Sequence, residues 1–319
     1  MPAVPSSDEG NLSYDPLEGL FIHTVKRGGP FGRAVALATS RDFKTWQDYG
    51  VVFHADKLDQ EVGSKNIQAR AADPTLQQAL YDAPQTHNVD VYNMGVFQYE
   101  GIYIGLPALF HATGPVPNYP NTDGFHLIQL ACSRDLKSWQ RLGDRATFIG
   151  PSRLDSGAYD LMQILPPSAP VVKDDELWFY YTGLKYRVNF TYVGTYPDGT
   201  TVPMPGRDRD AGAVCLAVLR RDGFVSLDAG AEPGTMLTRP FALPGTKLRL
   251  NADAAEGEII VTLLDGAGNT VAVSEGVAGD HVRADVKWKQ GDLSSLTGQV
   301  VSLRFKLRQA RLYSFWIEE

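Results

Sequence analysis

A repeated segment constrains the fold of this chain more than any other feature. Residues 36–47 read ALATSRDFKTWQ and residues 129–140 read QLACSRDLKSWQ, and a weaker copy, CLAVLRRDGFVSL, occupies residues 215–227. An acidic turn and an aromatic-rich strand precede each copy: LEGLFIHTV, YEGIYIGLPALF and DDELWFYYTGL. The pattern predicts a four-stranded meander present about three times, which is how the blades of a β-propeller are built.

Alternating apolar and polar residues predict short strands over most of the chain. The 31 Gly and 20 Pro in 319 residues favour many turns over long helices. One short helix is predicted at Pro74–Leu80, because Asp73 before Pro74 is typical of a helix start. The predicted strands are Arg33–Thr39, Val91–Gln98, Ile102–Leu109, Phe125–Cys132, Glu176–Tyr181, Ala213–Leu219, Lys247–Asn251, Glu258–Leu264, His281–Trp288, Gln299–Leu307 and Arg311–Ile317.

The first blade has no evident inner strand. HNVDVYNMGVFQ and GAYDLMQILPPSAPVVK precede the acidic turns of the second and third blades, whereas only MPAVPSSDEGNLSYDP stands before the first. Fewer than three full blades fall short of the four to eight that close a propeller. Because an uncovered strand edge favours pairing between chains, we expect a homo-oligomer.

The composition of the sequence changes near residue 230. Residues 231–245, AEPGTMLTRPFALPG, are rich in Gly and Pro, so we expect propeller blades at 1–230, a linker at 231–245 and a β-sandwich at 246–319. The fold class is therefore predicted as all-β, a partial propeller of about three blades with a C-terminal β-sandwich. The residues predicted to face the sandwich core are Leu248, Leu250, Ile260, Leu263, Val286, Trp288, Leu303, Phe305, Leu312 and Phe315.

Composition and motifs exclude several classes of protein. A net charge of −7 argues against nucleic acid as a partner, and two cysteines are too few for a disulfide framework. No apolar run of 18 residues and no secretory leader is evident, so we expect no membrane partner and a cytoplasmic chain as written. The motifs of P-loop, zincin, Rossmann and common serine-hydrolase enzymes are absent, and no cofactor or metal is expected.

Two aspartates open the predicted inner strands of the second and third blades. Asp90 lies in HNVDVYN and Asp160 in GAYDLMQ. Inner strands line the central channel of a propeller, so both carboxylates are expected to face one funnel, and two convergent carboxylates are the equipment of glycoside hydrolysis. The alternative is that both aspartates only cap turns.

Further polar and aromatic residues lie close to these aspartates or in the long loop 185–212. Tyrosines there could stack on sugar rings, although strand aromatics more often pack in the core. Glu100 aligns with Glu18 in a hairpin turn, and the repeated Arg-Asp pairs are expected to brace blades. The candidate substrate-binding residues are His87, Asn88, Tyr92, His111, Tyr159, Gln163, Tyr186 and Arg207.

The SRDxKxWQ turns, the DVYNMGVFxYEGIYIG strand pair and the ELWFYYTG strand resemble the five-bladed β-propeller glycosidases of the glycoside hydrolase family 32 and 43 type. This resemblance implies exo-type hydrolysis of a small glycoside or oligosaccharide by three inner-strand acids. Asp90 and Asp160 match channel-lining acids, and the acid of the first blade has no evident match. The alternative is a non-catalytic carbohydrate-binding or scaffolding module.

Overall fold

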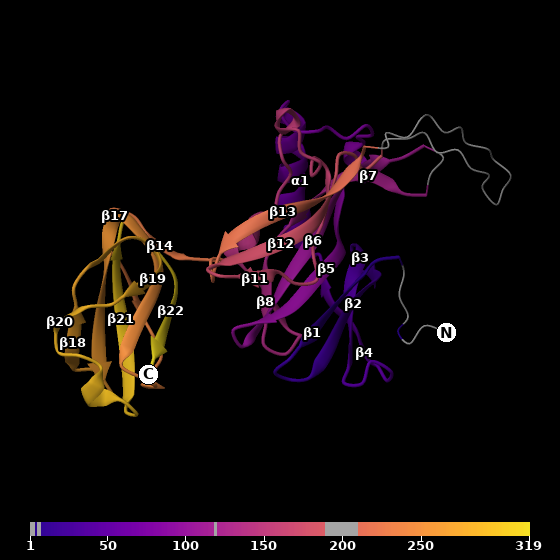
Figure 1. Ribbon diagram of the computed structural model, residues 1–319. Coiled ribbons are helices and arrows are strands. Elements are labelled where there is room, and N and C mark those ends of the chain that lie inside the picture. The colour runs from indigo at the N-terminus through magenta and orange to yellow at the C-terminus, as the bar shows by residue number, and fades with distance from the viewer. Residues whose placement is uncertain (1–3, 5–7, 118–119, 189–209) are drawn as a thin grey trace. The chain divides into compact units, whose positions relative to one another are not determined.

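The computed structural model describes residues 4, 8–117, 120–188 and 210–319 (Figure 1). The protein is all-β, as predicted, apart from α1 and four short 3-10 helices within these residues. The chain divides into a propeller unit, residues 1–171 with 178–218, and a sandwich unit, residues 172–177 with 219–319. The 3-10 helices are η1 (Pro84–Thr86), η2 (Gly143–Arg145), η3 (Leu154–Ser156) and η4 (Ser294–Leu296).

The first sheet of the propeller unit is a complete four-stranded meander. Its strands β1 (Gly10–Asp15), β2 (Leu20–Gly29), β3 (Gly32–Ser40) and β4 (Gln47–His54) lie in chain order (Figure 1). The expectation that this blade lacks an inner strand is wrong, because β1 pairs antiparallel with β2 along its whole length. Alternate residues of β1 are exposed and its sequence, GNLSYD, is largely polar, so the apolar pattern is faint.

The second sheet repeats this meander with one interruption. Strands β5 (Asn88–Tyr99) and β6 (Ile102–Pro115) form its inner hairpin, and β8 (Ala131–Ser133) and β9 (Trp139–Arg141) continue it outward. Strand β7 (Thr122–Ile128) pairs with the second half of β6, while β8 pairs with its first half.

The third sheet also has four strands among the described residues, but they do not form a simple meander. Strands β10 (Gln163–Leu165), β11 (Val171–Lys173) and β13 (Gly212–Arg220) all pair with β12 (Glu176–Leu184). The next strand, β14 (Leu227–Ala229), pairs instead with β22 of the sandwich. Because β1 is present and pairs with β2, the argument for self-association from a missing inner strand no longer holds, and self-association stays a prediction.

Three sheets meet where their inner strands approach one another. A Cβ at Gly95 of β5 would lie 1.9 Å from the carbonyl oxygen of Pro167, so only glycine allows this approach. Asn11 of β1 donates to Ser168 Oγ at 3.3 Å, and Thr24 of β2 donates to the carbonyl of Met94 at 2.6 Å. These contacts bring the inner strands of all three sheets to one side of the propeller unit.

The Arg-Asp turns of the repeat have the same hydrogen bonds in both copies. Asp42 Oδ1 accepts from the amides of Lys44 and Thr45 at 2.8 and 2.7 Å, and Asp135 Oδ1 accepts from those of Lys137 and Ser138 at the same distances. These bonds lower the pKa of each aspartate to about 2. The turn-forming role predicted for them is confirmed.

The helix lies earlier than predicted. Helix α1 runs from Lys57 to Ala72, and Asp73 is its C-cap rather than the N-cap of a helix at Pro74–Leu80. A capping box between Asp56 and Asp59 starts the helix. The helix has few apolar residues, and polar contacts hold it in place: Asp59 Oδ2 lies 2.6 Å from Arg141 Nη2. No helix of the described residues is long and apolar enough to cross a membrane.

One long strand organises the sandwich unit. Strand β17 (Lys247–Asp265) pairs with β19 (Val277–Asp285) and β22 (Ala310–Glu318) along its first half and with β18 (Thr270–Ser274) and β21 (Val300–Arg308) along its second. Strand β20 (Trp288–Gln290) pairs with β18. The single strand β17 thus spans both of the strands predicted at 247–251 and 258–264.

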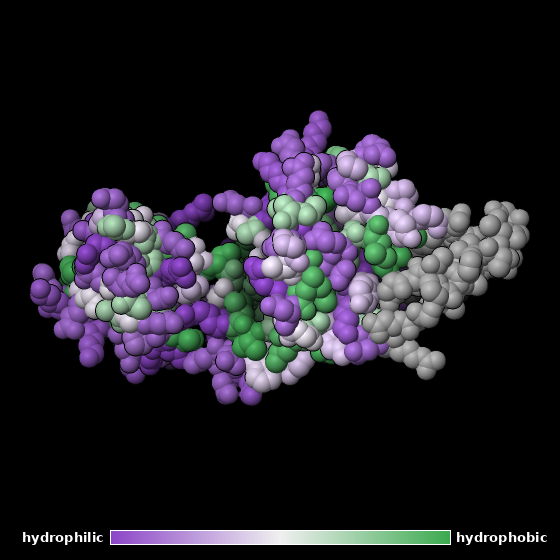
Figure 2. Space-filling model, turned by 90° about the horizontal axis from the view of Figure 1, so that it is seen from above, coloured by the Kyte–Doolittle hydropathy of each residue, from purple (hydrophilic) through white to green (hydrophobic). Residues whose placement is uncertain are grey.

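The sandwich core contains most of the residues predicted for it. Ile260 is the exception, because Ile259, Val261 and Leu263 are fully buried and alternate positions of a strand face opposite sides. Trp288 and Phe315 are partly buried against the core. Hydrophilic residues cover most of this unit in the view of Figure 2, as expected for strands with one apolar face.

The segment expected to be a linker contains strands. Strands β15 (Gly234–Leu237) and β16 (Phe241–Ala242) lie within residues 231–245 and both pair with β21. Proline and glycine interrupt these strands, which is why the segment resembles a loop in sequence.

Burial on β21 gives a test of the sandwich core. Leu303 is fully buried, whereas Val300 on the same strand is 54% exposed. We expect Leu303→Ala to lower the free energy of unfolding by about 2–5 kcal/mol through lost burial and a cavity, and Val300→Ala by less than about 0.5 kcal/mol. Urea denaturation followed by circular dichroism measures both, and equal losses would contradict the assignment of the core.

Candidate active site

Asp90 is a buried acid near the start of β5. Its Oδ2 accepts from the backbone amide of Arg33 at 3.1 Å and from Arg33 Nη1 at 2.9 Å. The turn between β2 and β3 rests on this carboxyl, since a Cβ at Gly32 would lie 2.8 Å from Oδ2, and Gly32 has a φ of +114°. Asp90 Oδ1 is buried and has no hydrogen-bond partner among the described residues, so one carboxyl oxygen is uncommitted.

Burial decides the protonation of Asp90. The side chain is 7% exposed, and desolvation raises its pKa even though the Arg33 guanidinium opposes the rise. Lys26 acts on the same carboxyl at longer range and also lowers its pKa. The proton is thus held more strongly on Asp90 than on an exposed aspartate.

Asp8, just before β1, has the same sequence spacing to the acidic turn of the first blade as Asp90, within β5, has to that of the second. Asp8 precedes the Glu18-Gly19 turn by ten residues, and Asp90 precedes Glu100-Gly101 by ten. Sequence reasoning missed Asp8 because the polar β1 was not recognised, although this equal spacing could have revealed it. The Lys26 Nζ atom lies 2.7 Å from Asp8 Oδ1 and lowers the pKa of that carboxyl, which is itself exposed.

Asp160 lies just before β10 in the third sheet and is also buried. Its Oδ2 accepts from the hydroxyl of Tyr181 at 2.6 Å, and it packs against Gly183 so tightly that a Cβ there would lie 2.8 Å from its own Cβ. The segment after Asp160 joins the second sheet, because the amide of His126 donates to the carbonyl of Met162 at 3.0 Å. Asp8, Asp90 and Asp160 therefore stand before or near the start of the inner strands in three successive sheets.

Aromatic rings and cations adjoin Asp90. The Lys26 Nζ atom lies 3.9 Å from the centre of the Tyr92 ring, and the guanidinium carbons of Arg33 and Arg187 lie 5.2 and 5.5 Å from it. Both arginines also lie over Phe110, at 5.2 and 5.3 Å. Tyr92, predicted as a binding residue, thus lies beside Asp90 within a group of cations, none of which the sequence pattern indicated.

Other predicted binding residues have local structural partners. Asn88 donates to the carbonyl of Phe31 at 2.8 Å and so holds the same turn that rests on Asp90. His87 lies 2.6 Å from Asp82. His111 is buried, stacks on Phe125, and has both ring nitrogens engaged.

The remaining candidates lie near loop 185–212. The hydroxyl of Tyr159 donates to Asp210 at 2.6 Å, and Lys185 pairs with the same carboxylate at 3.0 Å. Gln163 is buried at the start of β10, and Tyr186 is half-buried. Arg207, with Tyr119 and Tyr192, lies outside the described residues.

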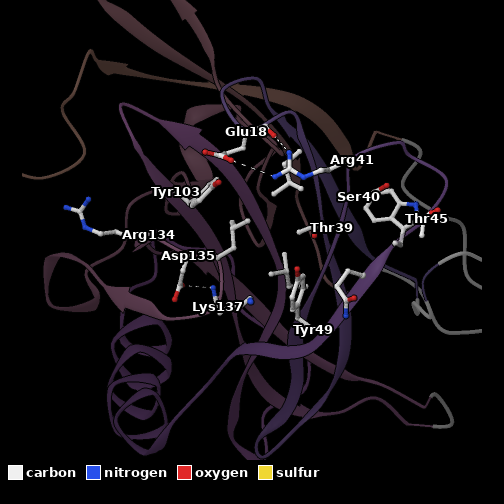
Figure 3. Close-up of a pocket in the computed structure, with 15 residues that line it drawn as sticks. Glu18, Thr39, Ser40, Arg41, Thr45, Tyr49, Tyr103, Arg134, Asp135 and Lys137 are labelled. Atoms are coloured by element: carbon white, nitrogen blue, oxygen red, sulfur yellow. Dashed lines mark hydrogen bonds and ion pairs between the residues drawn. The ribbon is translucent and has the colours of Figure 1, made fainter.

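A separate cleft of about 630 Å³ lies between the two Arg-Asp turns (Figure 3). Tyr49, Tyr103 and Lys137 line it together with Glu18, which is at the end of β1 opposite Asp8. A guanidinium nitrogen of Arg41 lies 3.8 Å from the carboxylate of Glu18, and Arg41 also donates to the backbone carbonyl of Glu18. Its acids, Glu18 and Asp135, are committed to an ion pair and a turn, so this cleft lacks free paired carboxylates.

The buried His111 gives a pH test of the propeller unit. Burial lowers its pKa to about 4, against about 6.5 in an unfolded chain. Between pH 6.5 and pH 4 the unfolded chain binds this proton and the folded chain does not. The contribution of His111 to the free energy of unfolding is therefore complete above pH 6.5 and falls by about 3 kcal/mol as the pH falls toward 4.

We expect His111→Gln to lose less free energy of unfolding than the wild type between pH 7 and pH 4. Urea denaturation followed by tryptophan fluorescence at several pH values measures the difference. His281→Gln is the control, since His281 is exposed in the sandwich unit. Parallel pH profiles of wild type and His111→Gln would contradict a neutral buried His111.

Comparisons with known proteins place this chain among distant structures only. No protein-family model and no curated protein matches the sequence. Similar solved structures include an N-acetylgalactosamine deacetylase from F. plautii (14% identity, TM-score 0.40, 70% of this chain and 53% of that one). They also include a GH32 β-fructofuranosidase of Bombyx mori (10%, 0.30, 97% and 80%) and a family 117 glycoside hydrolase of Zobellia galactanivorans (12%, 0.33, 95% and 84%).

Several neighbours are thus glycoside hydrolases, at low identity and low structural similarity. The chain spans about half the length, or less, of the first structures it matches.

Proposed function

We propose that this protein is a glycoside hydrolase acting on a small glycoside or oligosaccharide, with Asp8, Asp90 and Asp160 as its carboxylates. One observation carries the proposal: Asp8 and Asp90 precede the acidic turns of adjacent blades by the same ten residues and lie in different surroundings, exposed beside Lys26 and buried, which shift their pKa values in opposite directions. Hydrolysis of a glycosidic bond uses two carboxyl groups whose pKa values are shifted apart in this way.

Asp8 suits the role of base or nucleophile. Its exposed carboxylate is kept ionised by Lys26, and exposure leaves it open to a water molecule or a sugar carbon. The family 32 and 43 type glycosidases that the sequence resembles take their first acid from the first blade, and Asp8 supplies that position here.

Asp90 suits the role of proton donor. Arg33 occupies Oδ2, so the proton favoured by burial belongs on the free Oδ1, from which it can pass to a leaving oxygen. Asp160 accepts from Tyr181 and would stabilise positive charge on the sugar in the transition state. Tyr92 beside Asp90, with Tyr159, Gln163, Tyr186 and Arg207 near loop 185–212, would contact the sugar.

Hydrolysis of aryl glycosides tests the proposal. We expect activity on at least one of the arabinoside, xyloside, galactoside, fructoside and glucoside, and a fall in kcat of about 10²–10⁴-fold in Asp8→Asn, Asp90→Asn and Asp160→Asn. Asp48→Asn is the matched control, because Asp48 is an aspartate of the same unit that pairs with Arg27 away from these acids.

Activity unchanged in all three variants would remove these aspartates as catalysts. Binding of sugars with no hydrolysis of any substrate would favour the alternative, a non-catalytic carbohydrate-binding module.

A further inference from the structure

Arg187 is a half-buried cation with two buried donor atoms that have no hydrogen-bond partner. Its Nε and Nη2 atoms are inaccessible to solvent and make no hydrogen bond with any described residue. Its guanidinium lies over the rings of Tyr92 and Phe110, at 5.5 and 5.3 Å from their centres. Because buried donor atoms without a partner destabilise the fold, a ligand that accepts hydrogen bonds from Nε and Nη2 would stabilise this site.

The neighbouring charges do not supply that partner. Arg33 and Lys26, which face the same tyrosine ring, are themselves cations, and they already pair with Asp90 and Asp8. Asp123 acts on Arg187 at longer range, but its oxygens accept from the amides of Leu80, Tyr81 and Gly124.

Glu9 is the remaining carboxyl within electrostatic reach of Arg187. It is half-buried, and desolvation raises its pKa although Lys26 and Arg187 both oppose the rise. A carboxylate in contact with a guanidinium would have a lowered pKa, so Glu9 does not neutralise Arg187. Lys26 and Arg33 pair with Asp8 and Asp90, so Arg187 is the cation of this group to which the structure gives no ion pair among the described residues.

His126 provides a second, independent sign of a ligand. It is fully buried, and neither ring nitrogen has a hydrogen-bond partner among the described residues. Its ring lies between Tyr92 and Phe110, with centroids 4.7 and 4.9 Å away. Burial and the nearby arginine lower its pKa well below the usual value, so it is a neutral ring with one donor and one acceptor to offer.

We propose, on the basis of the hydrolase function above, that the substrate is an anionic saccharide and that Arg187, with His126, binds the carboxylate or sulfate group of its sugar. The planar guanidinium matches such an oxyanion with paired hydrogen bonds, and the Tyr92 ring offers an apolar surface for the sugar. The site adjoins Asp90, so an acidic sugar held there lies beside the proposed proton donor.

Binding of monosaccharides tests this inference apart from catalysis, because a free sugar has no glycosidic bond to cleave. Titration calorimetry on the full chain would compare galacturonate and glucuronate with galactose and glucose, and galactose 6-sulfate as the sulfate arm. We expect the acidic sugars to bind at least about tenfold more tightly than the neutral ones and to weaken as salt rises. Whichever binds more tightly, the uronic acids or the sulfated sugar, shows whether the site recognises a carboxylate or a sulfate group.

Substitution locates the site. We expect Arg187→Gln to weaken binding of the acidic sugar by about tenfold or more, Arg187→Lys to keep part of it, and Arg153→Gln to change nothing, since Arg153 is 64% exposed in the same unit. The comparison of acidic with neutral sugars uses the wild-type protein alone, so it tests the inference even if a substitution at Arg187 unfolds the chain.

Equal affinity for acidic and neutral sugars, or acidic-sugar binding that Arg187→Gln leaves intact in a folded protein, would overturn this inference and leave the hydrolase proposal standing. Arg187-dependent binding of acidic sugars without hydrolysis of any neutral or acidic aryl glycoside would support the anion site and overturn the hydrolase.

Discussion

The close approach of the inner strands is the constraint on which the propeller unit depends. Backbone meets backbone at Gly95 and Pro167, where no side chain fits. Polar side chains reinforce this contact at the same side, since Asn11 reaches Ser168 and Thr24 reaches Met94. Strands held this near to one another bring the residues at their starts toward a common region, whatever the sequence distance between them.

That geometry also explains the electrostatics of the candidate site. Asp90 is sealed under the turn before β3, where Gly32 lets the backbone rest against its carboxyl, while Asp8 precedes β1 and stays in water. The same residue type at the same spacing from an acidic turn therefore has two proton affinities, because desolvation acts on one and an ammonium group on the other. Arg187, which follows β12 of the third sheet in the chain, adds a cation to this region.

The repeat predicted the architecture well, and the errors have physical causes. Strands with one apolar face were found, but β1 was missed because its residues are mostly polar and half-exposed. Helix α1 was missed because buried ion pairs such as Asp59 with Arg141, rather than an apolar stripe, anchor it. Ile260 was assigned to the core although the alternation through Leu263 places it on the other face.

The sequence by itself determined the all-β class, the repeated meander with its Asp42 and Asp135 turns, and Asp90 and Asp160 as the acids that open inner strands. These features are local, since periodicity and turn chemistry act over a few residues. Only the tertiary structure decided that Lys26 pairs with Asp8, that Arg33 occupies one oxygen of Asp90, and that Arg187 lies over Tyr92. Such pairings join residues far apart in the chain, and their energies depend on burial, which no local pattern records.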